Sequence, residues 1–186
     1  MGNKRNHVCP VELAGSLDNR FRRWLQNPAK ILGPFVHEGM TVLDVGCGPG
    51  FFSVAMAEMV GKTGRVISAD LQEGMLQKLR SRIKGTELED RIELVRCDKD
   101  GINVKDKVDL ILAFYMVHEV PQKGPFFKEL RSLLKEEGQF LLIEPKLFHV
   151  SRTDFEATIR LAESAGFTAC QGPKLPFSWS AVLRHA

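Results

Sequence analysis

A glycine-rich turn after a short apolar run constrains the fold of this chain more than any other feature. The run VLDV at residues 42–45 is typical of a buried strand of a parallel sheet. It is followed by three glycines at alternate positions, Gly46, Gly48 and Gly50. Glycine lets the chain turn sharply and lets a ligand approach the bare backbone. Residues 41–50 therefore predict a strand, loop and helix start that bind a nucleotide-like ligand at the carboxyl edge of a sheet.

An acid, Asp44, stands two residues before the first of these glycines. A dinucleotide fingerprint spaces its glycines G-x-G-x-x-G and places a pyrophosphate at the helix N-terminus, whereas the spacing here is G-x-G-x-G. The Asp44 carboxylate would repel a pyrophosphate, because like charges at contact distance cost free energy. It suits a ligand that carries an ammonium and a sulfonium and no phosphate. The motif therefore favours S-adenosylmethionine over a nicotinamide dinucleotide.

A second acid, Asp70, ends the next predicted strand at residues 65–69, about 20 residues past the last glycine. At this position α/β nucleotide sites place an acid that accepts hydrogen bonds from ribose hydroxyls. Leu71 and Met75 follow, in a helix predicted over residues 71–84. Either side chain suits contact with an adenine ring, and core packing is an equally good interpretation of Met75.

Two further strands are predicted at residues 92–95 and 108–114. The first leads to Cys97 and Asp98, where an acid can accept a hydrogen bond from the exocyclic amine of adenine. The second is the most apolar segment and is expected at the centre of the sheet, beside the glycine-loop strand.

Periodicity and turn residues predict the remaining elements. Asn27 and Pro28 are typical of a helix N-terminus. Other helices are expected over residues 51–60, 122–135 and 152–165, and a strand over residues 140–143. Two last strands, at residues 167–170 and 177–183, are expected to form an antiparallel pair.

Length and composition are those of one globular α/β domain over residues 1–186, with an N-terminal helical segment at 1–37 and a core at 38–186. In the first segment, Phe21, Trp24 and Leu25 form either a lid over the ligand or a cover for the sheet edge. The four cysteines form no C-x-x-C pair, so we expect no metal site. His7 and Cys9 leave open a reactive thiol or soft-metal role. Without a predicted leader or membrane span, we expect a cytoplasmic protein with reduced thiols.

These motifs resemble the class I S-adenosylmethionine-dependent methyltransferases, especially the small single-domain branch that includes the ubiquinone and menaquinone biosynthesis methyltransferases. The resemblance is carried by VLDVGCGPGFFS at 42–53, VISAD at 66–70, CD at 97–98 and LLKEEGQFLLIEP at 133–145. It implies a Rossmann-like three-layer αβα sandwich. Its sheet would have seven strands in the order 3-2-1-4-5-7-6, with only the seventh antiparallel.

The resemblance also implies roles for matching residues. Asp44 and the glycine loop would hold the methionine moiety, Asp70 the ribose and Asp98 the adenine amine. Phe114 and Tyr115 would form the floor of the cleft. The full predicted set for cofactor binding is Asp44, Gly46, Cys47, Gly48, Gly50, Phe51, Asp70, Leu71, Met75, Cys97, Asp98 and Phe114.

Methyl transfer from a sulfonium is an in-line displacement, so holding the acceptor close and collinear supplies most of the catalysis. A base that removes the acceptor's proton adds about 10²–10⁴-fold. His118, after the central strand, is the predicted base, although a histidine that caps the next turn is an equally good interpretation. Tyr115 and Glu119 are further candidates, and His149 is expected to border the acceptor pocket.

The predicted acceptor is a small molecule methylated at oxygen, carbon or sulfur. The sequence AFYMVHEVP at 113–121 lacks the Asn/Asp-Pro-Pro-aromatic stretch of methyltransferases that act on adenine or glutamine amino groups. RNA or a protein side chain is the alternative acceptor, although we do not expect a nucleic-acid partner. A non-catalytic cofactor-binding subunit and an NAD(P)-binding protein are the alternatives outside the enzyme class.

Overall fold

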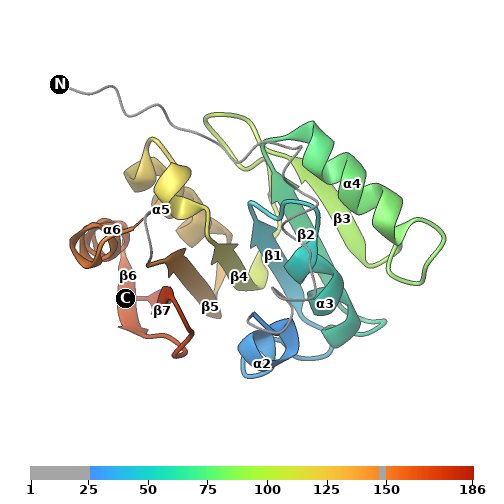
Figure 1. The fold of residues 1–186 in the computed structure, drawn as a ribbon, viewed down its shortest axis with the longest axis horizontal. Helices are drawn as coiled ribbons and strands as arrows, with labels where there is room; N and C mark the ends of the chain where they lie inside the picture. Colours follow the sequence, from blue (N-terminus) through green and yellow to red (C-terminus); the bar gives the residue numbers. More distant parts are fainter. Residues whose placement is uncertain (1–25, 147–149) are drawn as a thin grey trace.

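The computed structural model describes residues 26–146 and 150–186, which form one sheet between two layers of helices (Figure 1). The strand order is β3-β2-β1-β4-β5-β7-β6. Strands β1 to β5 pair in parallel, and β7 is antiparallel to both of its neighbours. The strands are β1 (Thr41–Val45), β2 (Arg65–Asp70), β3 (Ile92–Arg96), β4 (Val108–Phe114), β5 (Leu134–Pro145), β6 (Phe167–Gln171) and β7 (Ser178–His185). The sheet order and the single antiparallel strand implied by the motifs are confirmed.

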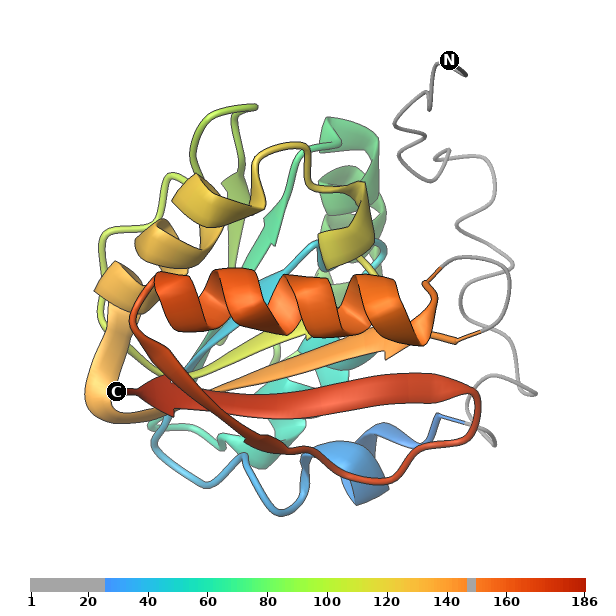
Figure 2. The same cartoon turned by 90° about the vertical axis from the view of Figure 1, so that its left-hand side faces the viewer.

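The helices divide between the two faces of this sheet (Figures 1 and 2). They are α2 (Pro28–Leu32), α3 (Phe51–Met59), α4 (Glu73–Ile83), the 3-10 turn η2 (Val117–Glu119), α5 (Lys123–Leu133) and α6 (Arg152–Ser164). Side chains of α2, α3 and α4 pack in one apolar cluster, and those of α5 and α6 pack in another. The three-layer αβα sandwich is therefore confirmed.

The central strand β4 shows why its sequence is so apolar. Successive side chains of a strand point to opposite faces. Leu112 packs in the cluster with α2, α3 and α4, whereas Ile111 and Ala113 pack in the cluster with α5 and α6. Because both faces are covered, β4 cannot alternate apolar with polar residues. It pairs with β1 in the middle of the sheet, as predicted.

The predicted start of α2 is also confirmed. The side chain of Asn27 accepts a hydrogen bond from the backbone N–H of Lys30 at 3.2 Å, and Pro28 occupies the first helical turn. The predictions for Phe21, Trp24 and Leu25, and those for His7, Cys9 and His149, lie outside the described residues.

The starts of α4 and β5 differ from those predicted for reasons that the structure shows, and several other element ends differ by one or two residues. Leu71 does not belong to the apolar stripe of α4, which begins at Glu73, and its side chain is 39% exposed. The cause is local, because Asp70 accepts a hydrogen bond from the N–H of Gln72 at 2.8 Å and holds these residues in a turn. Strand β5 begins at Leu134, directly after α5, and a register shift against β4 takes up the charged residues 135–137.

Candidate active site

The loop between β1 and α3 turns through left-handed backbone at each of its three glycines. The φ angles are +69° at Gly46, +54° at Gly48 and +82° at Gly50. A Cβ atom added at Gly46 would lie 2.8 Å from Cγ of Met116, whereas one at Gly48 would have no neighbour within 4 Å. Gly46 therefore allows close packing, and Gly48 borders open space in which a ligand can approach the backbone.

Asp70 joins the end of β2 to this loop. Its Oδ2 accepts a hydrogen bond from the N–H of Gly48, and its Oδ1 accepts one from the N–H of Gln72, both at 2.8 Å. Burial raises the pKa of Asp70 above its usual 3.8 and outweighs these backbone hydrogen bonds, which lower it. A carboxylate offers about four lone-pair sites, so Asp70 can hold the loop and also accept hydrogen bonds from a ligand.

Asp44 lies beneath the loop, with its side chain buried at 2% exposure. The hydroxyl of Ser53, in the first turn of α3, donates to Asp44 Oδ2 at 2.6 Å. Sequence reasoning did not assign Ser53 to the site, although its position in the first turn of the predicted helix places it close to the strand end. The two acids, Asp44 and Asp70, make this edge of the sheet suited to a cationic ligand rich in hydroxyls.

The end of β3 lies beside Asp70. The N–H of Cys97 donates to the backbone oxygen of Asp70 at 2.9 Å, so that Asp98 comes next along the same edge. Asn103, with a left-handed φ of +62°, donates from Nδ2 to Asp98 Oδ2 at 2.9 Å and to the backbone oxygen of Arg96 at 3.0 Å. The sequence analysis missed Asn103, which orients Asp98 from a polar connection without a motif of its own.

The two cysteines at this edge are neutral thiols. Burial, reinforced by the charges of Asp44 and Asp70, raises the pKa of Cys47 well above its usual value. Burial also raises the pKa of Cys97, to about 12. Since the thiolate is the reactive form, neither cysteine is suited to be a nucleophile. Within residues 26–146 and 150–186, no group of three or more His, Cys, Asp or Glu side chains could hold a metal ion.

Four other residues predicted to contact the cofactor occupy different surroundings. Met75 is buried at 2% exposure, which fits the core-packing interpretation. Phe51 and Phe114 are buried as well, and both rings pack against Phe52, with centroids 5.0 and 4.3 Å from it. Leu71 is partly exposed next to Asp70, where its side chain can still border a ligand.

Beyond β4, Tyr115 begins a second group of polar side chains. It has a left-handed φ of +58°, an uncommon backbone conformation for a residue other than glycine. Its hydroxyl lies 2.5 Å from Oγ of Ser178, at the start of β7. Since Ser178 can donate to the backbone oxygen of Pro176 at 3.0 Å, the hydroxyl of Tyr115 can be the donor to Ser178. Tyr115 thus connects the end of β4 to β7.

His118 stands on the 3-10 turn η2, with a carboxylate near each ring nitrogen. Nδ1 lies 2.7 Å from Oε2 of Glu144, at the end of β5, and Nε2 lies 3.9 Å from Oε1 of Glu119. Burial lowers the pKa of His118, but the hydrogen bond and charge of Glu144, together with the charge of Glu119, raise it to a net value above the usual 6.5. The sequence analysis did not assign Glu144 to the site. The signal that could have found it is its position, as an acid at the carboxyl end of a buried strand.

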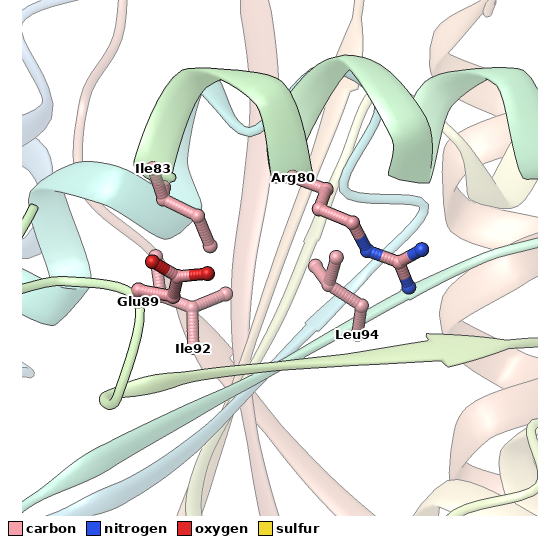
Figure 3. Close-up of a pocket in the computed structure, with 5 residues that line it drawn as sticks. All are labelled: Arg80, Ile83, Glu89, Ile92 and Leu94. Carbon is pink, nitrogen blue, oxygen red and sulfur yellow. The ribbon is translucent and has the colours of Figure 1, made fainter. Parts of the chain in front are cut away.

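The hollow in Figure 3 lies elsewhere. It is lined by Arg80 and Ile83 of α4, Ile92 and Leu94 of β3, and Glu89. These residues flank the first half of β3, whereas the predicted site lies at the carboxyl ends of the strands.

In the part of the chain that the structure describes, no helix is long and apolar enough to cross a membrane.

Comparisons with known proteins identify the family of the chain. Residues 36–175 match a family described as "Methyltransferase domain". The ubiquinone/menaquinone biosynthesis C-methyltransferase of Hydrogenovibrio crunogenus is 28% identical over 124 residues, which cover 66% of this chain and 48% of that protein. The enzyme of the same name from Escherichia fergusonii is 29% identical over 110 residues, 59% of this chain and 44% of its own. The chain thus spans about half the length of the curated relatives it matches.

Solved structures extend the likeness to nearly the whole chain. A SAM dependent methyltransferase from Aquifex aeolicus superimposes with a TM-score of 0.84 at 26% identity, covering 95% of this chain and 98% of that one. A putative S-adenosyl-L-methionine-dependent methyltransferase from Methanococcus maripaludis has a TM-score of 0.77 at 19% identity, covering 100% and 98% of the two chains. The second likeness shows the shared fold alone.

Proposed function

Because the chain belongs to the methyltransferase domain family, among the class I S-adenosylmethionine-dependent enzymes, we propose that it methylates a small-molecule acceptor. The observation that carries the proposal is the open glycine loop, whose Gly48 N–H is bonded to the Asp70 carboxylate at 2.8 Å. The residues fit the cofactor, because open space lies over the backbone of Gly48 while Asp44 and Asp70 supply negative charge beside it.

Each part of the edge has a role in this proposal. Asp44 and the loop from Gly46 to Gly50 hold the methionine moiety, Asp70 accepts hydrogen bonds from the ribose, and Asp98 accepts one from the adenine amine. When bound, S-adenosylmethionine supplies a methyl group activated by its sulfonium. Cys47 and Cys97, as neutral thiols, add polarisable surface and no charge.

The second group of side chains receives the acceptor. We assign His118 as the base that takes the acceptor's proton, a contribution of about 10²–10⁴-fold to the rate. Tyr115 forms part of the floor between the two groups, because its ring lies 4.3 Å from that of Phe114 and its hydroxyl is held by Ser178. The relatives are named as C-methyltransferases of ubiquinone and menaquinone biosynthesis, so carbon is the acceptor atom that we test first.

Calorimetric titration tests the cofactor assignment. The protein is titrated with S-adenosylhomocysteine, NADH and NADPH, each against the wild type, Asp70→Ala and Asp90→Ala. We expect binding of S-adenosylhomocysteine alone, weakened by about 10-fold or more in Asp70→Ala, because hydrogen bonds to charged groups contribute about 1.5–3 kcal/mol each. Asp90 is exposed just before β3, at the end of the strand that lies away from the predicted site. Asp90→Ala should therefore bind S-adenosylhomocysteine as the wild type does.

Other outcomes distinguish the alternatives. Binding of a nicotinamide dinucleotide would overturn the proposal. Binding of S-adenosylhomocysteine without methyl transfer to any phenol, quinol, thiol or carbon acid would favour a non-catalytic subunit. Methyl transfer to RNA, with binding that weakens steeply as salt rises, would replace the small-molecule acceptor by a nucleic acid.

A further inference from the structure

We propose that Glu144 is a positioning residue that holds the His118 ring and its proton, so that Nε2 faces the reaction as a proton acceptor. The inference rests on the proposed function, because it concerns the acceptor side of the same site. It narrows the substrate class to acceptors that lose a proton as they are methylated, at oxygen, sulfur or an acidic carbon.

The geometry around Glu144 is the first support. Its Oε1 accepts a hydrogen bond from the N–H of Val117 at 3.0 Å, and its Oε2 accepts one from the N–H of His118 at 3.2 Å. The same Oε2 lies 2.7 Å from Nδ1 of His118. One side chain from β5 thus holds both the backbone of η2 and the imidazole ring that η2 carries.

The burial of Glu144 is the second support. Its side chain is only 2% exposed, and an ionised carboxylate is costly to bury unless hydrogen-bond donors surround it. Two of the donors are backbone N–H groups, from Val117 and His118. Because an ionised carboxylate can only accept hydrogen bonds, the 2.7 Å contact between its Oε2 and Nδ1 of His118 requires the proton to be on Nδ1. The arrangement therefore favours the neutral imidazole tautomer with its proton on Nδ1.

Two carboxylates and one lysine near His118 have opposite effects on its pKa. Glu144 faces Nδ1 from β5, Glu119 faces Nε2 from η2, and Lys123 of α5 opposes them both. The hydrogen-bonded Glu144 has the larger effect and raises the pKa of His118, against the lowering caused by burial and Lys123. A base with a pKa raised toward the working pH is a better proton acceptor.

Methyl transfer with His118 as the base conserves both protons and electrons. A lone pair or carbanion pair of the acceptor forms a bond to the methyl carbon as the carbon–sulfur bond breaks, and the electrons of that bond remain on sulfur. The acceptor's proton passes to Nε2 of His118, which becomes an imidazolium stabilised by Glu144, and solvent later removes the proton. His118 keeps its Nδ1 proton throughout.

NMR of the ring nitrogens tests the pair without any acceptor. Long-range 1H–15N spectra of the ¹⁵N-histidine protein are recorded against pH, and His118→Gln assigns the His118 signals among the five histidines. In the wild type we expect the Nδ1–H tautomer and a pKa above 6.5. Glu144→Gln should lower that pKa by about 1–3, the effect of an opposite charge at this distance.

The matched control is Glu119→Gln, which removes the more distant carboxylate and should lower the pKa by less. A His118 titration that is the same in Glu144→Gln and the wild type would overturn the proposal. If Glu144→Gln does not fold, the wild type still decides, because an Nε2–H tautomer of His118 would also overturn it.

Binding separates this inference from the proposed function. Glu144→Gln should bind S-adenosylhomocysteine as the wild type does, because Glu144 lies outside the predicted cofactor set. If the wild type binds no S-adenosylhomocysteine, the proposed function fails while the NMR result still stands. With an acceptor in hand, the acid limb of the kcat profile should move to lower pH in Glu144→Gln, which a purely structural role would not cause.

Discussion

The two halves of the candidate site are built in different ways. In the cofactor half, which comprises Asp44, the loop 46–50, Asp70 and Asp98, the central bond joins a backbone N–H to a carboxylate. In the acceptor half, which comprises Tyr115, His118, Glu144 and Ser178, side chains pair with one another across β4, β5 and β7. The first half is therefore centred on the shape of the glycine loop, with side-chain pairs such as Ser53–Asp44 supporting it, and the second half is centred on pairs of side chains.

The largest effect is expected for Gly50→Ala, which tests how strictly the cofactor half depends on backbone shape. The added Cβ would occupy left-handed backbone and collide with Leu79 of α4. Strain and overpacking together should lower the free energy of unfolding by about 2–4 kcal/mol, measured by urea denaturation.

Its control is Gly48→Ala, which has the same left-handed backbone and no neighbour within 4 Å. We expect it to lose only about 1–2 kcal/mol, and to bind S-adenosylhomocysteine more weakly because the methyl group enters the ligand's space. Equal losses of stability in the two variants would contradict the distinction between a packing glycine and a ligand glycine.

Ser53→Ala is expected to have the next largest effect. It removes the hydroxyl that donates to the buried Asp44 at 2.6 Å and should cost about 1.5–3 kcal/mol of unfolding free energy. Ser81→Ala is the matched control, because that exposed hydroxyl bonds only to a helix carbonyl, at 2.9 Å. A loss as small as that of the control, within about 0.5 kcal/mol, would show that Asp44 does not need Ser53.

In the acceptor half, Tyr115→Phe should have a smaller effect. It removes the hydrogen bond to Ser178 and should lower the free energy of unfolding by about 0.5–1.5 kcal/mol. Ser178→Ala and the double variant complete a double-mutant cycle, which measures the coupling of the two side chains. Additive losses would mean that Tyr115 and Ser178 do not act as a pair.

The smallest expected effect is a difference between the two halves in how the free energy of unfolding depends on pH. The folded pKa of His118 is raised above 6.5, so its contribution to stability is full below pH 6.5 and is lost as pH rises through the folded pKa. The pKa of Asp70 is raised above 3.8 by burial, so the folded state gains stability as pH falls through that folded pKa.

Urea unfolding of the wild type, His118→Gln and Asp70→Asn, from acidic pH to above the folded pKa of His118, measures what each of these two residues contributes to stability. We expect His118→Gln to lose the decline above pH 6.5 and Asp70→Asn to lose the gain at acidic pH. If the free energy of unfolding of His118→Gln changes with pH above 6.5 just as that of the wild type does, the raised pKa of His118 is contradicted.

The same contrast explains what could be predicted from the sequence. Asp44, the three glycines and Asp70 follow one another at a characteristic spacing, and periodicity gave the order and type of nearly all elements. The predicted start of α4 was too early, because the helical spacing of Leu71 suggested a helix where the local Asp70–Gln72 hydrogen bond forms a turn. The length of β5 was missed because its first residues pair with β4 through a register shift that no local pattern encodes.

The acceptor half was predicted only in part, for a physical reason. His118 and Tyr115 were identified because they follow the central strand. Their partners, Glu144 and Ser178, lie 26 and 63 positions further along the chain. The Tyr115–Ser178 pair joins β4 to β7, which are not consecutive, and a whole helix separates His118 from Glu144. Neither pair follows a spacing rule, so only the sheet order, with its registers, brings the partners together.

The 63 positions between Tyr115 and Ser178 also set an order of events during synthesis. At about 5–20 residues per second, a ribosome adds Ser178 about 3–13 seconds after Tyr115. During this interval the segments that carry the glycine loop, Asp70 and His118 have been made, whereas Ser178, which secures Tyr115, is still to come. Under the proposed function, every residue assigned to the methyl donor is thus made before the residue that completes the acceptor side.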